Sequence, residues 1–355
     1  MKSLIFGYGI TGQSFARYLS NKLIDFDIYD RSFIDHPNAF SKLPDRKKLD
    51  SYQMVYMSPG INLRKLYPGN ELHALPYLTD LDIFFKEDTS FKIGITGTNG
   101  KSTCCMHLNQ LIQGSQILGN FGMPLLDAIN SGKEYSIIEL SSFQLEKMQQ
   151  NGLDYGVLLN MRSDHLDHHG TLKSYQNAKK RILQSKKSTS ENDPFLLYKE
   201  IIGKPYQGDL LRSHLINLPH RLEACTPRNG LQVINDSKST NTDSLKYALK
   251  NLPVSAYHHL IIMGDPAKEQ YKNLRITGPS NVFICGKYSE SLAEKILHQN
   301  KFIFPSLEET LKHIKSLQQK SGILFSPGHP SGEDFQNFEV RGNYFKSLAR
   351  EIFDD

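Results

Sequence analysis

The stretch GITGTNGKST at residues 94–103 is the feature that most constrains how this chain folds. It follows the apolar run Phe91–Thr96 and precedes a helical pattern that begins near Ser102, so it predicts a turn between a strand and a helix. Backbone N–H groups in such a turn, at a helix N-terminus, favour phosphate oxygens. The match to the pattern G-x-x-x-x-G-K-[ST] is incomplete, because Ile95 stands where that pattern has glycine. We nevertheless expect Lys101 to meet phosphate and Ser102 to ligate Mg²⁺; a glycine-rich turn without a ligand is the alternative.

A second glycine pattern lies at the N-terminus, where GYGITG places Gly7, Gly9 and Gly12 after an apolar strand and before a helix. Asp30 follows the next predicted strand, about 20 residues on, as in dinucleotide-binding units. The pattern itself requires only phosphates at a helix N-terminus. It therefore leaves open NAD, another nucleotide, or a tight turn with no ligand.

Strands and helices alternate along the chain, which predicts an α/β fold with open sheets. We expect three domains, at residues 1–89, 90–215 and 216–355, because 355 residues exceed the roughly 100 to 200 of one domain. The polar segment 185–194 is interpreted as a linker or loop. In the third domain, strands are expected at residues 232–235, 259–263, 281–285 and 323–326.

Composition narrows the class of protein. Hydrophobic residues at 39% and charged residues at 22% are ordinary for a folded, water-soluble chain. The formal net charge of +5 comes from scattered Lys and Arg, which fits anionic small molecules better than nucleic acid. The four cysteines form no C-x-x-C pair, and no apolar run approaches a membrane span, so we expect a cytoplasmic protein.

Two strand ends carry further candidate ligands. Glu139 ends the apolar strand SIIE and is expected at the sheet edge that holds the phosphate loop, as a second metal ligand; capping of the next helix is the alternative. Asn160 begins NMRSDHLDHHG, which contains three histidines. Its spacing matches no structural zinc pattern, so we expect His165 to ligate magnesium, with a solvated histidine-rich loop as the alternative.

These motifs, in their order along nearly the whole chain, resemble the Mur ligases, which form amide bonds at the expense of ATP in peptidoglycan precursor synthesis. ELSSFQLE and NDSKSTN resemble the D-glutamate-adding branch of that family. The motifs that carry the resemblance are GYGITG, SPGI, TGTNGKST, GNFG, ELSSFQLE, DHLDHHG, LPHR, NDSKSTN and SPGHPSGEDFQNFEVRG.

The resemblance implies three domains: a Rossmann-like first domain, a central domain of the phosphate-loop ATPase type and a Rossmann-like third domain. It also implies ATP and Mg²⁺ as cofactors, and UDP-N-acetylmuramoyl-L-alanine and D-glutamate as substrates of a monomer. Catalysis is then assigned to Lys101, Glu139, His165 and Lys179, with the metal held by Ser102, Glu139, His165 and a carbamylated Lys179. ATP binding is assigned to Gly97, Thr98, Asn99, Gly100, Lys101, Ser102, Thr103, Arg221, Asp236 and Asn241. The UDP-sugar is assigned to Gly7, Gly9, Ile10, Thr11, Gly12, Asp30, Ser58, Gly60 and Asn120. D-Glutamate is assigned to Lys238, Thr240, Ser331 and Phe338.

The chain departs from the family pattern at three places. The central domain lacks a G-x-H-N-x-x-N motif that helps hold adenine in the family, so it is expected to be shortened. Ala267 stands where the family has lysine, and Lys268 is a candidate replacement. His329 lies where the family has small residues. An active, trimmed ligase is the favoured interpretation; a relative that binds nucleotide-sugar without efficient ATP turnover is the alternative.

Overall fold

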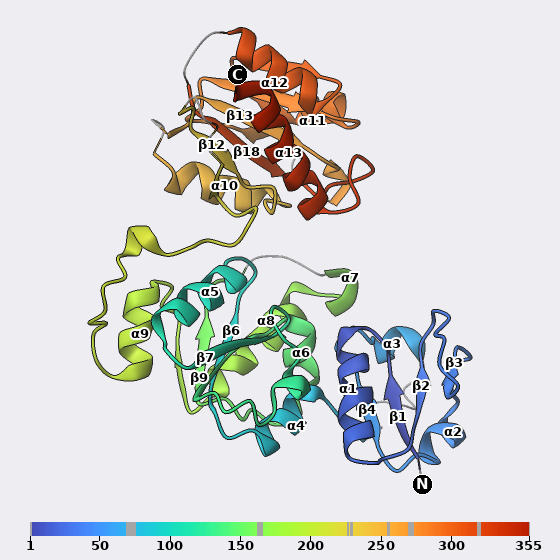
Figure 1. Ribbon diagram of the computed structural model, residues 1–355. Coiled ribbons are helices and arrows are strands. Elements are labelled where there is room, and N and C mark those ends of the chain that lie inside the picture. Colours follow the sequence, from blue (N-terminus) through green and yellow to red (C-terminus); the bar gives the residue numbers. More distant parts are fainter. Residues whose placement is uncertain are drawn as a thin grey trace. The chain divides into compact units, whose positions relative to one another are not determined.

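The computed structural model describes residues 2–68, 76–161, 166–225, 227, 230–253, 256–268, 273–317 and 321–354. The chain divides into two compact units, Met1–Ile216 and Asn217–Asp355 (Figure 1). Unit 1 contains two five-stranded sheets and unit 2 contains a six-stranded sheet. The division of unit 1 into two separate domains stays a prediction.

The first sheet of unit 1 is parallel and has the order β3-β2-β1-β4-β5. Its inner strand β1 is apolar and buried along its whole length, as expected for a strand covered on both faces. The strands are β1 (Ser3–Phe6), β2 (Phe26–Tyr29), β3 (Ala39–Phe40), β4 (Val55–Met57) and β5 (Tyr77–Leu78), and the helices are α1 (Ile10–Asn21), α2 (Arg46–Asp50) and α3 (Leu63–Leu66).

The second sheet of unit 1 is also parallel, in the order β10-β9-β6-β8-β7. The central strand β6 leads directly into the phosphate-loop segment. The strands are β6 (Phe91–Thr96), β7 (Ser115–Gly119), β8 (Tyr135–Glu139), β9 (Tyr155–Leu158) and β10 (Lys187–Thr189). The helices are α4 (Asp80–Glu87), α5 (Lys101–Leu111), α6 (Ser142–Lys147), α7 (Leu166–His169), α8 (Leu172–Lys180) and α9 (Pro194–Ile202).

Unit 2 contains a sheet in the order β11-β12-β18-β13-β15-β17, in which only the β11–β12 pair is antiparallel. A pair of short strands, β14 (Leu274–Arg275) and β16 (Ile296–Leu297), lies apart from it. The main strands are β11 (Glu223–Ala224), β12 (Val233–Asn235), β13 (His259–Met263), β15 (Asn281–Cys285), β17 (Lys301–Phe304) and β18 (Ile323–Gly328). The helices are α10 (Thr242–Asn251), α11 (Ser289–Lys295), α12 (Leu307–Ser316) and α13 (Phe338–Phe353).

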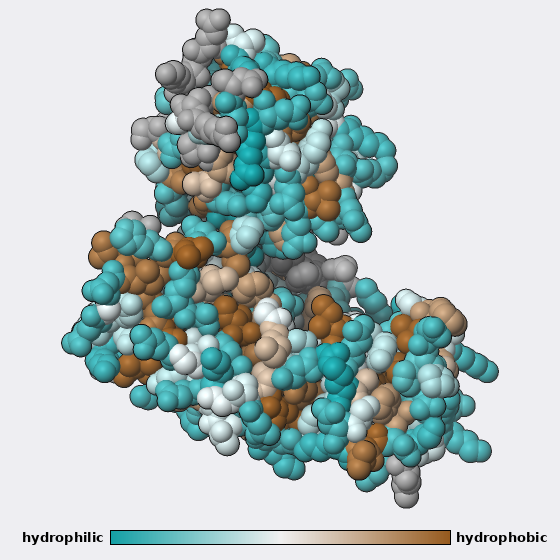
Figure 2. All heavy atoms as spheres, viewed as in Figure 1, coloured by the Kyte–Doolittle hydropathy of each residue, from teal (hydrophilic) through white to brown (hydrophobic). Residues whose placement is uncertain are grey.

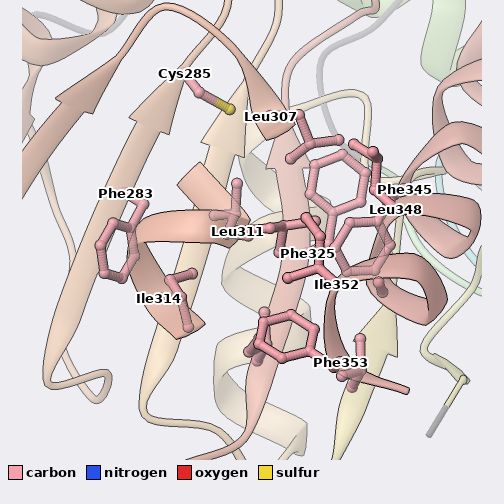
Figure 3. Packing of buried hydrophobic residues seen from close by; sticks show 14 of the residues in the cluster. Phe283, Cys285, Leu307, Leu311, Ile314, Phe325, Phe345, Leu348, Ile352 and Phe353 are labelled. Carbon is pink, nitrogen blue, oxygen red and sulfur yellow. The ribbon is translucent and has the colours of Figure 1, made fainter. Parts of the chain in front are cut away.

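The unit 2 sheet has an apolar cluster on each face. Alternate residues of β13 belong to different clusters, because successive side chains of a strand point to opposite faces. On one face, Phe283 and Phe325 pack with side chains of α12 and α13, including Leu311 and Phe345 (Figure 3). On the other face, the cluster includes side chains of α10 and α11. Hydrophilic residues cover most of the unit 2 surface seen in Figure 2, which fits this internal arrangement.

The predicted α/β class is confirmed, and the expected strands at residues 91–96, 259–263 and 281–285 match β6, β13 and β15. The interpretation of residues 185–194 as a linker or loop is wrong in part, because β10 lies within that segment and pairs with β9. This strand is at the sheet edge with mostly exposed residues, so its polar composition gave no apolar signal. Within the described residues, no helix has the length and apolar character needed to cross a membrane.

Candidate functional site

The phosphate loop lies between the end of β6 and the start of α5. Gly100 has a φ of 86°, in the left-handed region that favours glycine, and forms the N-cap of α5. The helix therefore begins at Lys101 with its first N–H groups next to the turn, which is the arrangement that favours anions. Lys101 Nζ donates to the carbonyl oxygens of Gly97 and Thr98, each at 3.0 Å.

Two residues outside the loop hold its conformation. Asn160 follows β9, and its side chain accepts from Asn99 N at 3.0 Å and donates to Asn99 O at 2.9 Å. Tyr175 on α8 places its hydroxyl 2.8 Å from Thr98 Oγ1. Neither residue was predicted to be functional from the sequence. Tyr175 precedes Lys179 by four residues on one helix, a spacing that puts them on the same face and could have identified it.

Glu139 ends β8, next to β6 in the sheet, and is 2% exposed. Its Oε1 accepts a hydrogen bond of 2.7 Å from Asn120 Nδ2, whereas Oε2 is buried with no hydrogen-bond partner among the described residues. The following helix α6 is instead capped by Ser141 and Gln144, which form a capping box. Glu139 is therefore not the cap, and no residue that the structure describes supplies the partner that a buried oxygen normally has.

Lys179 on α8 is 2% exposed and lies beside the phosphate loop. Its Nζ donates to Gly97 O at 2.8 Å and to Thr96 Oγ1 at 3.2 Å. Ser102 is buried in the first turn of α5. The Glu139 carboxylate and the Ser102 hydroxyl are oxygen donors of the type that Mg²⁺ prefers, so these two residues fit a magnesium ion. His165, the remaining predicted ligand, lies outside the described residues.

The N-terminal glycine turn forms a second, separate feature of unit 1. Gly7 has a φ of 94°, and a Cβ on Gly12 would lie 2.1 Å from Gly7 O, so α1 approaches the turn too closely for any side chain there. Asp30 accepts from Tyr8 N at 2.7 Å and from Ser32 N at 2.9 Å. One carboxylate oxygen of Asp30 thus holds the backbone of the glycine turn, and the other holds the segment directly after Asp30.

Two further predicted residues lie around this turn. Ser58 donates from Oγ to Gly7 O at 2.7 Å, which connects the loop after β4 with the glycine turn. Ile10 starts α1 with 74% of its surface exposed, an unusual position for a large apolar side chain. Asn120, in contrast, lies at the second sheet, with Glu139.

In unit 2, Arg221 lies between two residues whose backbone is left-handed, His220 with φ 63° and Leu222 with φ 46°. Asp236 accepts from Leu222 N at 3.2 Å and from Ser326 Oγ at 2.8 Å. Each of its carboxylate oxygens therefore accepts a hydrogen bond from another residue of unit 2. Burial raises the pKa of Asp236 to about 7. Asn241 caps α10 by accepting from Ser244 N at 2.9 Å. The structure thus gives Asp236 and Asn241 structural partners, while their assignment to ATP stays a prediction.

Two of the residues predicted to bind D-glutamate, Lys238 and Phe338, are in contact at the N-terminus of α13. Lys238 Nζ is 3.6 Å from the centre of the Phe338 ring, a cation–π contact. Ser331 is 7% exposed, and its Oγ is buried without a hydrogen-bond partner among the described residues. Thr240 is half-buried in the same NDSKSTN segment. A cation and an unpartnered hydroxyl are groups that could bind a carboxylate.

Arg341 supports this region and was not predicted as a functional residue. It is fully buried on α13 and donates from Nη2 to Ser237 O at 2.8 Å and from Nη1 to His329 O at 3.1 Å. It therefore joins the NDSKSTN segment to the SPGHPS segment. Ala267 is in a short 3-10 helix, Pro266–Lys268, and the side chain of Lys268 lies outside the described part of the chain.

Parallel α/β sheets, a phosphate loop and a buried carboxylate beside it define a nucleotide-binding α/β protein with a site suited to phosphoryl chemistry. The Mur ligase middle domain model matches residues 95–197. Beyond that domain, the chain is similar over nearly its whole length to curated proteins of the Mur ligase type.

Two curated relatives illustrate the similarity in sequence, and both are named UDP-N-acetylmuramoylalanine–D-glutamate ligase. The protein of Buchnera aphidicola subsp. Acyrthosiphon pisum (strain Tuc7) is 28% identical over 435 residues, covering 99% of this chain and 98% of the relative. The protein of Haemophilus ducreyi is 27% identical over 425 residues, covering 98% and 97%. Both aligned lengths exceed the 355 residues of this chain, so the relatives contain segments that it lacks.

Two solved structures share the fold. A MurF ligase from Thermotoga maritima in complex with ADP has a TM-score of 0.56 at 14% identity, covering 98% of this chain and 94% of that one. A pseudomurein peptide ligase type C from Methanothermus fervidus also has a TM-score of 0.56 at 14% identity, covering 99% and 100%. At this identity the likeness concerns the fold alone.

Proposed function

We propose that the protein is an ATP-dependent ligase that joins D-glutamate to UDP-N-acetylmuramoyl-L-alanine. The observation that carries the proposal is the buried Oε2 of Glu139, which has no hydrogen-bond partner in the described part of the chain and lies in the sheet that also carries the phosphate loop. Relatives of that name, similar over nearly the whole chain, support the choice of substrates. The reaction would take place in the cytoplasm, where ATP and nucleotide-linked precursors are available.

The chemistry explains why a phosphate loop is needed. A carboxylate is a poor electrophile, so the L-alanyl carboxylate must first be activated. Its oxygen attacks the γ-phosphorus of ATP and ADP leaves, which gives an acyl phosphate. The amine nitrogen of D-glutamate then attacks the acyl carbon, loses a proton, and expels inorganic phosphate from the tetrahedral intermediate.

The residues of unit 1 would bring two anions together for the first step. Lys101 and the backbone N–H groups of residues 97–103 would hold the phosphates and offset their charge. Ser102, Glu139, His165 and Lys179, the last as a carbamate, are the proposed holders of Mg²⁺, which offsets phosphate charge when bound. Carbamylation needs a neutral amine and CO₂, and it would convert the buried lysine into an additional oxygen ligand.

The remaining proposed contacts belong to the substrates. Asn120 donates to Glu139 and has been assigned to the sugar-peptide, so it would connect the acceptor substrate with the metal site. The glycine turn around Gly7, with Ile10, Thr11 and Asp30, would receive the UDP part. Lys238, Thr240, Ser331 and Phe338 would receive D-glutamate; Arg221, Asp236 and Asn241 are proposed for ATP.

The alternative function is that of a nucleotide-sugar-binding protein, and it is favoured by the fact that the relatives contain segments that this chain lacks. If the missing segments include the adenine contacts, the protein would bind nucleotide-sugar without efficient ATP turnover. Retention of Lys101, Glu139 and Lys179 favours the ligase, because a protein that no longer used ATP would have no need for these side chains.

The test is phosphate release from Mg²⁺-ATP by the purified full chain. Both substrates are supplied together, each is then omitted in turn, and D-glutamate is replaced by L-glutamate. Release that requires both substrates and the D-enantiomer supports the ligase. No release from folded protein that still binds UDP-N-acetylmuramoyl-L-alanine would support the binding protein instead.

A further inference from the structure

Three side chains with metal-binding groups come together in unit 1, apart from the residues proposed to hold magnesium. They are Glu146 on α6 and the consecutive His168 and His169 on α7. One donor atom from each lies within 4.8 Å of the other two. Glu146 Oε2 is 3.1 Å from His168 Nε2 and 3.7 Å from His169 Nδ1. The carboxylate oxygen thus lies within reach of one nitrogen of each ring.

The ring of His169 is oriented by a partner on the opposite side. Its Nε2 lies 2.9 Å from Ser142 Oγ, so its Nδ1 is the nitrogen that faces Glu146. A ligating histidine usually donates its second ring N–H to an oxygen, which fixes both the tautomer and the direction of the ligating nitrogen. Ser142 Oγ is placed to accept such a hydrogen bond from His169 Nε2.

The ring of His168 is held by packing. Its centre is 4.1 Å from the centre of the Phe143 ring, and Asn62 Nδ2 donates to His168 O at 3.2 Å. The side chain of His169 is fully buried and that of His168 is 11% exposed, whereas that of Glu146 is 32% exposed. The cluster is therefore largely enclosed by protein and open to solvent on the carboxylate side, where an ion could enter.

We propose that Glu146, His168 and His169 form a binding site for a divalent transition-metal ion of the Zn²⁺ class. Two imidazole nitrogens and one carboxylate oxygen suit Zn²⁺, Co²⁺ or Ni²⁺ better than Mg²⁺, which prefers oxygen ligands. Three protein ligands leave a fourth position to water. Binding at His168 Nε2 requires the ring proton on Nδ1, which lies 3.4 Å from Asn62 Nδ2, so the Asn62 amide would have to turn its oxygen toward that proton.

The charges around the cluster have opposing effects on metal binding. Burial lowers the pKa of His168, which favours the neutral imidazole that a metal requires, although Glu146 acts against this shift. The positive charges of Lys147 and Lys65 also lower the pKa of His168, and the same charges would repel a metal ion. The carboxylate of Glu146 offsets part of that repulsion.

A bound ion would connect α6 with α7 and would fix the ring of His169. The edge of that ring packs against Tyr175, with ring centres 5.5 Å apart, and the Tyr175 hydroxyl lies 2.8 Å from Thr98 Oγ1. The ion would thus brace the side of the phosphate loop without belonging to it.

The test uses chelator-treated full chain titrated with Co²⁺ in excess Mg²⁺, followed by the visible d–d absorption of Co²⁺ and by competition with Zn²⁺. We expect a band typical of four-coordinate Co²⁺ in the parent protein. Glu146→Gln and His168→Gln should each weaken Co²⁺ binding by about 100-fold or more, since even loss of a residue that only supports a ligand costs 10- to 100-fold. Glu139→Gln is the matched control, because it removes a carboxylate from the magnesium site while the Co²⁺ band should persist.

Several outcomes would overturn the proposal. One is the absence of a band in the parent protein; another is a band lost in Glu139→Gln but kept in Glu146→Gln, which would assign the ion to the phosphate loop. To separate ligand loss from misfolding, thermal unfolding is measured with and without Zn²⁺. Zn²⁺ should raise the unfolding temperature of the parent and of Glu139→Gln, but not that of Glu146→Gln; an equal rise in Glu146→Gln would also contradict the site.

Discussion

Asn120 Nδ2 donates a 2.7 Å hydrogen bond to Glu139 Oε1, and the other oxygen of the same carboxylate is buried without a partner among the described residues. One oxygen is thus fixed by the protein, and the second is left for a ligand. This division of roles allows the two proposed functions of Asn120, orienting the metal ligand and contacting the sugar-peptide, to be measured separately.

We expect Asn120→Ala to raise the Mg²⁺ concentration needed for half-maximal phosphate release by about ten-fold, because loss of a residue that orients a ligand costs 10- to 100-fold in metal affinity. Asn120→Asp should be more severe, since it places a second carboxylate next to Glu139. The measurement is the Mg²⁺ dependence of phosphate release, at several concentrations of UDP-N-acetylmuramoyl-L-alanine. A change confined to the KM for that substrate would assign Asn120 to the substrate alone.

Lys101→Ala should lower ATP-dependent phosphate release by at least about 100-fold, the effect typical of removing one group that stabilises a developing negative charge. UDP-sugar binding should stay nearly unchanged, since the glycine turn around Gly7 belongs to a different sheet. Titration calorimetry with the UDP-sugar checks the second statement. Loss of both phosphate release and UDP-sugar binding in a folded variant would mean that the assignment of the two sites is wrong.

Tyr175→Phe should raise the KM for ATP about three- to ten-fold, because one hydrogen bond of this kind contributes roughly 0.5–1.5 kcal/mol. The contact that is lost is the one between the Tyr175 hydroxyl and Thr98 Oγ1. Tyr247→Phe is a matched control, because Tyr247 is 63% exposed and lies in unit 2. Identical kinetics for the two variants would show that the Tyr175 hydroxyl does not contribute to ATP binding.

Gly12→Ala and Gly9→Ala should behave differently although each adds one methyl group. At Gly12 the new Cβ would lie 2.1 Å from Gly7 O, whereas at Gly9 no heavy atom lies within 4 Å. We expect Gly12→Ala to abolish UDP-sugar binding by displacing the turn, and Gly9→Ala to fold and melt like the parent. Equal thermal stability and equal UDP-sugar affinity in both variants would contradict this account of the turn.

His259 should make the stability of unit 2 sensitive to acid. It is fully buried in β13, and burial, together with neighbouring His258, lowers the pKa of its imidazole to about 4. The unfolded chain has an ordinary histidine pKa of about 6.5 and therefore binds more protons at intermediate pH. This contribution to stability is complete above about pH 6.5 and falls by about 3 kcal/mol as the pH drops to 4.

Calorimetric unfolding between pH 4 and 7 measures this effect. His259→Leu should flatten the pH dependence of the unit 2 transition, whereas replacement of the exposed His214 should leave it unchanged. An equally steep loss of stability in His259→Leu would assign the acid sensitivity to other groups.

The sequence predicts the inner strands of this protein better than its edges. The strands β6, β13 and β15 are mostly apolar and mostly buried, and their predicted limits match the structure. The edge strand β10 is polar and only half enclosed, so it cannot be distinguished from a loop. The helix α9 was missed as well, because its apolar residues follow directly on the segment interpreted as a linker.

The candidate site shows a similar limit. Local motifs predicted roles for Lys101 and Glu139, because glycine spacing and a carboxylate at a strand end are visible over a few residues. The hydrogen bond from Asn120 to Glu139 joins the end of β7 to the end of β8. The contact of Lys238 with Phe338 joins the segment after β12 to the start of α13. Such relationships are set by tertiary packing, so a sequence motif can mark each residue but not its partner.

The left-handed conformations of His220 and Leu222 on either side of Arg221 have a kinetic consequence. Backbone N–H bonds to Glu223 and Asp236 fix these two residues before any ligand arrives. A segment that is already ordered does not have to lose conformational freedom on binding. Association at Arg221 should therefore proceed at a rate set by diffusion and orientation of the ligand, rather than by a slow rearrangement of the segment that carries the arginine.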